Sequence, residues 1–162
     1  MGMIAIDPAA ADWISANPDR RCQTLLDYWR SLAAGADRLP RRREIDPVAL
    51  PPALLRSIFL VDVVRKDDGM PPRFRFRLLG SDIVDRERTK VGQYVDQLGS
   101  VAETAEMLAQ YRDCLAGRVR IRQSTLVWDS QSKEHRHYRV MLLPLADGAL
   151  VDALLGLALY DR

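Results

Sequence analysis

His135 and His137 are the only histidines in the chain, and a single residue separates them. Side chains two positions apart on an extended strand point to the same face, so both imidazoles could reach one metal ion. A metal site needs at least one further ligand, and the sequence places no obvious carboxylate or cysteine to supply it. We therefore expect these histidines to lie at a solvated strand end beside a turn, with no bound metal.

The remaining reactive side chains also lack catalytic spacing. Cys22 and Cys114 are the only cysteines, and no C-x-x-C motif joins them, so we expect two reduced, partly buried thiols. No G-x-S-x-G, phosphate-binding glycine loop, G-x-G-x-x-G or H-E-x-x-H motif is present. Asp82 and Asp85 lie three residues apart, which a helix cap and an exposed helical carboxylate explain. The sequence therefore predicts no catalysis.

Arginines alternate with other residues at positions 73, 75 and 77 and again at positions 118, 120 and 122. If each segment is a strand, it presents one strongly positive face. An anionic ligand or a nucleic acid is one interpretation of such a face. We favour a solvated outer face, on which arginine stems cover apolar surface and pair with carboxylates. Phe74 and Phe76 point the other way, so the arginine face lacks the aromatic side chains typical of single-strand binding.

The composition describes one ordinary globular domain. The chain has 162 residues, of which 48% are hydrophobic and 28% charged, with a net charge of +2. A chain of this length can bury its own core. No apolar run approaches the roughly 20 residues that cross a bilayer, and no secretory leader is visible. We therefore expect a cytoplasmic protein with no membrane or nucleic-acid partner.

Two helices are predicted from capping residues and apolar periodicity. The first covers residues 18–34, with Pro18 in its opening turn. Its apolar residues recur at helical spacing: Leu25, Leu26, Trp29 and Leu32. The second covers residues 100–116, where Ser100 and Glu103 form a capping box and Gly117 ends the helix.

Five strands complete the pattern. The β-branched and aromatic run Ile58–Val64 predicts a central strand, and residues 73–78 alternate strictly, so the two form a hairpin. Three further strands are predicted within residues 119–128, 138–145 and 150–160. The order predicts an α+β fold, a five-stranded antiparallel sheet with helices on one face and an extra N-terminal helix. We place the N-terminal helix and linker in residues 1–50 and the sheet domain in residues 51–162.

Short motifs in a fixed order sharpen this interpretation. They are Tyr28-Trp29, Leu39-Pro40-Arg41-Arg42, Ile45-Asp46-Pro47, the segment 73–81, Gly92-Gln93-Tyr94 and the segment 143–148. In these motifs the chain resembles a bacterial PAS-like family of short stand-alone proteins, common in α-proteobacteria and mostly of unknown function. The resemblance covers nearly the whole chain after about Gln23.

The resemblance implies a sensory or regulatory module, because PAS domains hold small ligands or cofactors between the sheet and the helices. Its partners would be a small molecule, a signalling protein or both, and the fold alone fixes neither a ligand nor a cofactor. The ligand would lie between the inner sheet face and residues 81–115. The polar side chains best placed to contact it are Ser81, Tyr94, Tyr111 and Tyr138.

Two cofactors known in this fold are not expected here. The segment Arg112-Asp113-Cys114-Leu115 does not match the asparagine-cysteine-arginine motif of flavin photoreceptors. Haem-binding PAS domains carry a proximal histidine in the helical middle, where this chain has none. The cofactor, if any, is therefore undetermined.

The resemblance also bears on assembly, because PAS domains usually pair through helices that flank the sheet. The apolar stripe of the first helix lies outside the PAS core, and soluble monomers seldom expose such a patch. We therefore predict a homodimer held by Leu25, Leu26, Trp29 and Leu32. The competing interpretation packs this stripe on the outer face of its own sheet.

Two other functions stay open beside ligand sensing. One is a purely structural dimerisation or interaction module with a filled core, and the other is a small α+β enzyme of an unrecognised class. A cavity larger than a few waters would favour ligand sensing over the filled core. A polar pocket with perturbed pKa values would favour an enzyme.

Overall fold

The computed structural model describes residues 20–34, 36, 38–127 and 135–160. Its centre is one antiparallel sheet of five strands in the order β2-β1-β5-β4-β3. The strands are β1 (Ile58–Val64), β2 (Arg73–Leu79), β3 (Arg120–Val127), β4 (His135–Leu145) and β5 (Ala153–Tyr160). The predicted α+β fold with a five-stranded antiparallel sheet is confirmed.

The helices form two groups along the chain. Before the sheet come α2 (Arg20–Leu32), the 3-10 turns η1 (Arg42–Glu44) and η2 (Pro47–Ala49), and α3 (Pro52–Leu55). Between β2 and β3 come α4 (Ser81–Glu87), η3 (Val95–Gln97), α5 (Val101–Asp113) and η4 (Cys114–Ala116). Prolines at the start of η2 and α3 suit a first helical turn, and Pro51 disfavours helical backbone at the preceding Leu50, where η2 ends.

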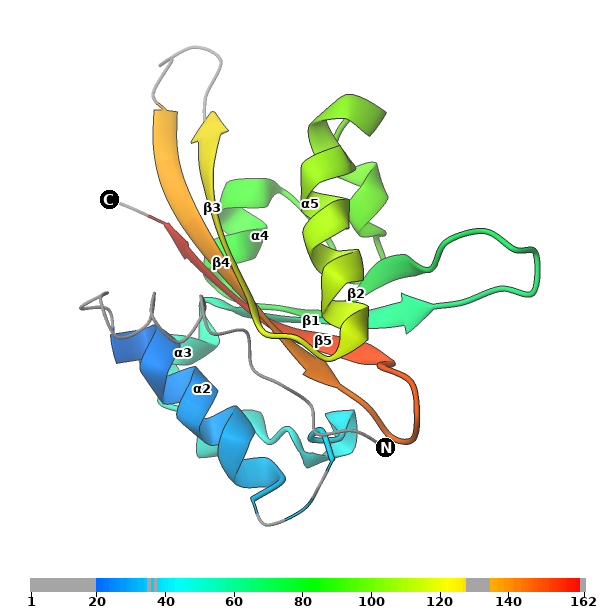
Figure 1. The fold of residues 1–162 in the computed structure, drawn as a ribbon. Coiled ribbons are helices and arrows are strands. Elements are labelled where there is room, and N and C mark those ends of the chain that lie inside the picture. Colours follow the sequence, from blue (N-terminus) through cyan, green and yellow to red (C-terminus); the bar gives the residue numbers. More distant parts are fainter. Residues whose placement is uncertain (1–19, 35, 37, 128–134, 161–162) are drawn as a thin grey trace.

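Figure 1 shows that the two groups cover opposite faces of the sheet. α4 and α5 lie on one face, called the inner face below, and α2 with α3 lies on the other, called the outer face. The predicted helices on one face and the extra N-terminal helix are therefore both present.

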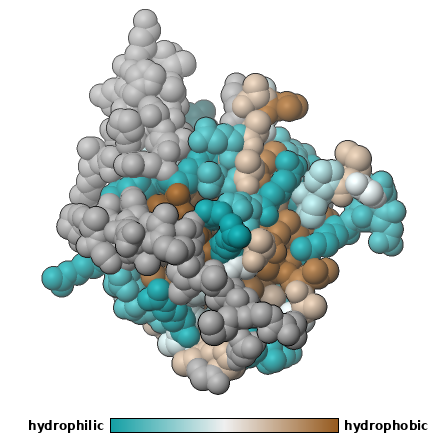
Figure 2. All heavy atoms as spheres, in the orientation of Figure 1, coloured by the Kyte–Doolittle hydropathy of each residue, from teal (hydrophilic) through white to brown (hydrophobic). Residues whose placement is uncertain are grey.

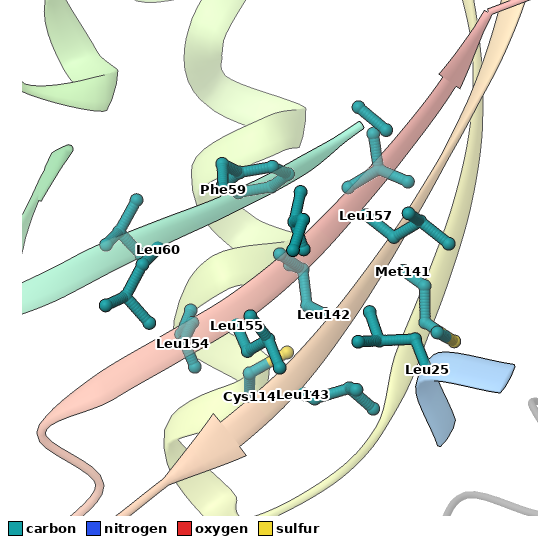
Figure 3. Close-up of a cluster of buried hydrophobic side chains, with 14 of the residues drawn as sticks. Leu25, Phe59, Leu60, Cys114, Met141, Leu142, Leu143, Leu154, Leu155 and Leu157 are labelled. Carbon is teal, nitrogen blue, oxygen red and sulfur yellow. The ribbon is translucent and has the colours of Figure 1, made fainter. Parts of the chain in front are cut away.

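β5 is the middle strand of the sheet, and its first seven residues are all buried. Successive side chains of a strand point to opposite faces, so burial of the whole run requires cover on both sides. Figure 3 shows Leu154, Leu155 and Leu157 of this strand among the other buried side chains. The helices α4 and α5 cover β5 on the inner face, and α2 covers it on the outer face, so α2 completes the core (Figure 1).

The stripe of α2 packs against the sheet of its own chain. Leu25 and Leu26 are 0% and 1% exposed, and Trp29 is 5% exposed. The indole Nε1 of Trp29 donates a hydrogen bond of 2.9 Å to the carbonyl oxygen of Pro144 on β4. We expected this stripe to be exposed on a monomer and therefore to hold a dimer, and that premise was wrong. Leu32, at the end of α2, is half-buried.

Residues on both sides of the boundary predicted at residue 50 belong to one hydrophobic cluster, which includes Leu39, Leu50 and Leu54. The linker is also tied to the sheet end, because the amide of Ala146 donates a hydrogen bond of 3.0 Å to the carbonyl of Pro40. The division into residues 1–50 and 51–162 thus describes an order along the chain, and no separate core lies in the described part of the first segment.

The two arginine-rich strands, β2 and β3, are the opposite edges of the sheet. On β2, Arg73 pairs with Asp96 at 2.8 Å and Arg77 lies 3.6 Å from Asp62. These carboxylate partners agree with the solvated, paired face expected for residues 73–77. Figure 2 likewise shows hydrophilic residues along the projecting β1–β2 hairpin at the right of the view.

Candidate ligand site

A cavity lies between the inner face of the sheet and the helical segment that starts at α4. Its apolar lining comes from four strands, from α4 and α5, and from the residue that follows η3: Phe59, Phe76, Ile83, Leu98, Met107, Val140 and Ala158. Val140 and Ala158 are direct partners on β4 and β5. Because Ala158 is small, the middle of the sheet leaves space that a larger side chain would fill.

Polar side chains meet at the same cavity. They are Glu87, Thr89, Tyr111, Arg122, Tyr138 and Tyr160. Thr89 already donates its hydroxyl to Gln93 at 2.9 Å. The other five come from α4, α5 and three different strands, so the folded chain alone assembles this group.

Glu87 and Tyr160 form the hydrogen bond that defines the polar end of the cavity. The Tyr160 hydroxyl donates to Glu87 Oε1 at 3.1 Å. Burial raises the pKa of the Glu87 carboxyl, and the bond from Tyr160 and the positive charge of Arg122 partly oppose that rise. Burial and the nearby Glu87 charge also raise the pKa of Tyr160. The phenol therefore keeps its proton, and the carboxyl is easier to protonate than an exposed glutamate.

Tyr160 is held from two sides. Its ring stacks on that of Tyr138, with centroids 5.5 Å apart and an angle of 20° between the planes. The guanidinium carbon of Arg86 lies 5.0 Å from the Tyr160 ring centroid, within the range of a cation–π contact. These contacts fix the hydroxyl that points at Glu87.

Tyr111 enters the cavity from α5 and is 4% exposed. Its ring contacts Phe74 edge-on with centroids 5.3 Å apart and stacks near Phe59 at 6.5 Å. Burial raises the pKa of its hydroxyl, with Tyr138 adding to the effect. Within the described part of the chain, no side chain or carbonyl forms a hydrogen bond with that hydroxyl.

Arg122 corrects the prediction for the second arginine segment. We expected residues 118, 120 and 122 to form a solvated outer face, but Arg122 lines the cavity on the inner face. The register explains this, because Arg122 pairs with Val140, a cavity residue, and Arg120 pairs with Leu142. Arg120 also forms an ion pair with Asp113 at the end of α5, so Arg120 and Arg122 face the helices.

The free space inside the lining is about 40 Å³, which is room for roughly three water molecules. The core is therefore not packed solid between the sheet and the helices. A cavity larger than a few water molecules was expected to favour ligand sensing over a filled core. This cavity is not larger than that, so its volume alone does not favour ligand sensing.

Of the four polar residues predicted to contact a ligand, the structure brings Tyr111 and Tyr138 to the cavity. Ser81 is exposed at the first residue of α4, where Gly80 occupies the N-cap position. Tyr94 is half-buried, with the guanidinium carbon of Arg73 3.7 Å from its ring centroid. Neither Ser81 nor Tyr94 lines the cavity, so their predicted contact with a ligand has no support in this geometry.

Sequence reasoning missed Glu87, Arg122 and Tyr160. A signal for Glu87 exists, because it follows the buried Ile83 by four residues and so lies on the same helix face. A carboxylate on the core-facing side of a short helix is unusual enough to mark a candidate. Arg122 and Tyr160 depend on strand register, which no local motif in these segments fixes.

The described residues contain no group of three or more histidine, cysteine, aspartate or glutamate side chains placed to hold a metal. The side chains of His135 and His137 lie outside the described residues, so the prediction for them stays as it was. Cys22 and Cys114 are both buried. Burial raises the pKa of the Cys114 thiol to about 12, so it is not a nucleophile near neutral pH.

A protein-family model described as a PAS domain matches residues 19–159. The chain belongs to the PAS domain family. The match includes α2 and the linker, so the helix on the outer face of the sheet is part of what this PAS family shares. PAS membership identifies a sensory or regulatory type of module. A search of curated proteins finds no match to this PAS chain.

None of the helices in the described part of the PAS chain is both long enough and apolar enough to cross a membrane.

Proposed function

We propose that this chain is a sensory or regulatory PAS module that binds a small molecule in the cavity between β1–β5 and the α4–α5 segment, without catalysis. The observation that supports it most is the set of polar side chains gathered at an apolar cavity. Glu87, Tyr111, Tyr160 and their neighbours converge there from separate elements, as ligand sites with a few placed polar groups do.

A filled-core interaction module explains these side chains less well. An interaction module gains nothing from the half-buried carboxylate of Glu87, because even partial burial of a charge costs free energy that an apolar residue would not. The small volume favours a ligand of few atoms, or a larger one that moves the lining side chains apart.

An enzyme would also use a carboxyl whose pKa is raised, as that of Glu87 is. Catalysis needs a second group that acts with it, such as a nucleophile or a base within hydrogen-bond reach. The hydroxyl of Thr89 is bonded to Gln93, and the described lining contains no histidine, cysteine or serine. Binding is therefore the simpler use of this site.

The homodimer stays a proposal, and it needs another surface than the stripe of α2, which is buried on its own sheet. A signalling protein partner and a cytoplasmic location likewise belong to the proposal. Cys22 and Cys114 form no disulfide, which agrees with a reducing compartment.

Native mass spectrometry of the protein purified from its own host tests the function and the assembly together. We expect an added mass from a retained small molecule, and the same spectrum reports monomer or dimer. Ala158→Leu is the decisive variant, because its longer side chain occupies the cavity, and we expect it to lose the added mass. Ala49→Leu on η2, an exposed position, is the matched control. Wild-type protein that carries no molecule and gains no thermal stability from any small compound would refute the proposal.

A further inference from the structure

The hydroxyl of Tyr111 belongs to a cavity-lining residue and has an unused hydrogen-bonding capacity. It lines the cavity, its residue is 4% exposed, and no hydrogen bond joins it to another described residue. Its ring neighbours Phe59 and Phe74 offer no polar atom. Polar groups inside folded proteins usually have a hydrogen-bond partner, and the described residues supply none to this hydroxyl. A bound molecule in the cavity would provide that partner.

The charges around the cavity specify what kind of molecule fits. Glu87 from α4 and Arg122 from β3 both line it, and their charges oppose each other. Glu87 would attract a cationic head group and Arg122 would repel it, and the reverse holds for an anionic head group, so the two charges together favour neither net charge. An uncharged head group meets neither repulsion.

The side chains that line the cavity include both hydrogen-bond acceptors and hydrogen-bond donors. Glu87 accepts one hydrogen bond from Tyr160, and an ionised carboxylate has room for further donors. Tyr111 can donate its hydroxyl proton, and the guanidinium of Arg122 only donates. A complementary head group therefore offers one donor toward Glu87 and one acceptor toward Tyr111 and Arg122.

We infer that the cavity binds a short apolar molecule whose head group carries a donor and an acceptor on one carbon, as a protonated carboxylic acid or a primary amide does. This inference rests on the proposed function and names its ligand class. The apolar tail would lie against Phe59, Val140 and Ala158. Space for roughly three waters limits the tail to a few carbons unless side chains move.

The affinities of a carboxylic acid and of a primary amide for the cavity should depend differently on pH. A carboxylic acid binds in its protonated form, whose fraction falls by about tenfold for each pH unit above its pKa, so its apparent affinity falls as pH rises. An amide needs no proton and keeps its affinity while Glu87 is ionised. The groups that face Glu87 are Tyr160, Arg122, Tyr138, Tyr111 and Arg86, from β5, β3, β4, α5 and α4.

The test is an NMR titration of the ¹⁵N-labelled full chain with four probes of nearly equal size: propionamide, propionate, 2-butanone and sec-butylamine. We expect propionamide to bind at pH 6 and pH 8, propionate to bind more tightly at pH 6 than at pH 8, and the ketone and the amine to bind more weakly than the amide. Tyr111→Phe removes only the hydroxyl and should weaken propionamide by about three- to tenfold. Tyr94→Phe, a tyrosine outside the cavity, is the matched control and should change nothing.

Glu87→Gln provides a second test should Tyr111→Phe lose its fold. Because this variant removes the repulsion of an anionic head group, the loss of propionate affinity between pH 6 and pH 8 should become smaller. If the ketone or the amine binds as tightly as the amide, and Ala158→Leu abolishes that binding, the head-group inference is wrong while the proposed ligand-binding function stands. If no probe binds the wild type and native mass spectrometry finds no retained molecule, both fail.

Discussion

The ring of Phe59 on β1 lies against the backbone of Gly156, its direct partner on β5. A Cβ atom at position 156 would overlap three ring atoms of Phe59, namely Cζ, Cε1 and Cε2. Glycine therefore makes room on the inner face for an aromatic ring that also lines the cavity. The same ring meets Phe76 edge-on, with centroids 6.1 Å apart, so it cannot move without disturbing its neighbours.

Gly156→Ala should force this ring out of position. We expect a loss of about 1–3 kcal/mol in the free energy of unfolding, as for other overpacked cores, measured by urea denaturation. The double variant Gly156→Ala/Phe59→Leu should recover part of the loss, because the smaller side chain leaves space for the new methyl group. Strictly additive losses would show that the two residues do not compete for this space.

Trp29 connects α2 to the sheet through packing and through its bond to Pro144. We expect Leu25→Asp/Trp29→Asp to unfold the protein rather than yield a folded monomer, because two carboxylates would enter the outer-face core. Circular dichroism and sedimentation together separate these outcomes. Thr24→Asp, at an exposed position of the same helix, should stay folded. A well-folded double variant whose only change is dissociation of a dimer would restore the role that the sequence suggested for the stripe.

The alternation in β2 and the turns between strands predicted the sheet well because they are local signals. Phe74 and Phe76 are buried and Arg77 is exposed, as period-two alternation requires. The side of the sheet on which α2 lies is a different kind of fact. Its stripe needs apolar cover, and the sequence of the helix alone does not say whether a partner or β4 supplies it. The unbroken apolar run of β5 carried that information, since only a strand covered on both faces is apolar throughout.

The candidate site was predicted only in part for a similar reason. Tyr111 and Tyr138 belong to elements whose inner face could be inferred, and both line the cavity. Arg122 was assigned to the solvated side because the face of an edge strand depends on its register with β4, where Arg122 lies opposite Val140. A shift of one residue would exchange the two faces of β3, and no turn within the described residues fixes that register from sequence.

Glu44 should stabilise the linker in a pH-dependent way. It accepts two hydrogen bonds from Arg38, at 2.7 and 3.2 Å, and one of 2.9 Å from the amide of Arg41. The bonds from Arg38 and Arg41 lower the pKa of Glu44 to about 2. A carboxyl with a lowered pKa stabilises the fold above its ordinary pKa, and that contribution is lost as the pH falls toward the lowered value.

Glu44→Gln should therefore reduce the free energy of unfolding at pH 7, and the difference from wild type should shrink between about pH 4.5 and pH 2. Because these side chains are partly exposed, added salt should also reduce the difference. Glu106→Gln, at an exposed position of α5, is the control. A difference that stays constant down to pH 2 would contradict an ionic role for Glu44.

The contribution of Glu87 to the free energy of unfolding should change with pH in the opposite direction to that of Glu44. Burial raises its pKa, so between the ordinary pKa of glutamate and the raised one the folded state binds more protons than the unfolded state. Stability attributable to this group is then greatest at low pH and falls as pH rises through that window. Glu87→Gln carries no titrating proton, so the free energy of unfolding of wild type minus that of the variant should decline from pH 4.5 upward.

Tyr160→Phe removes the hydrogen bond that favours the ionised form, which should raise the pKa of Glu87 further and extend the decline to higher pH. Urea denaturation at half-unit steps from pH 4.5 to pH 8 measures all three curves. A difference between wild type and Glu87→Gln that is flat over this range would show that the carboxyl at the cavity is as solvated as one on the surface.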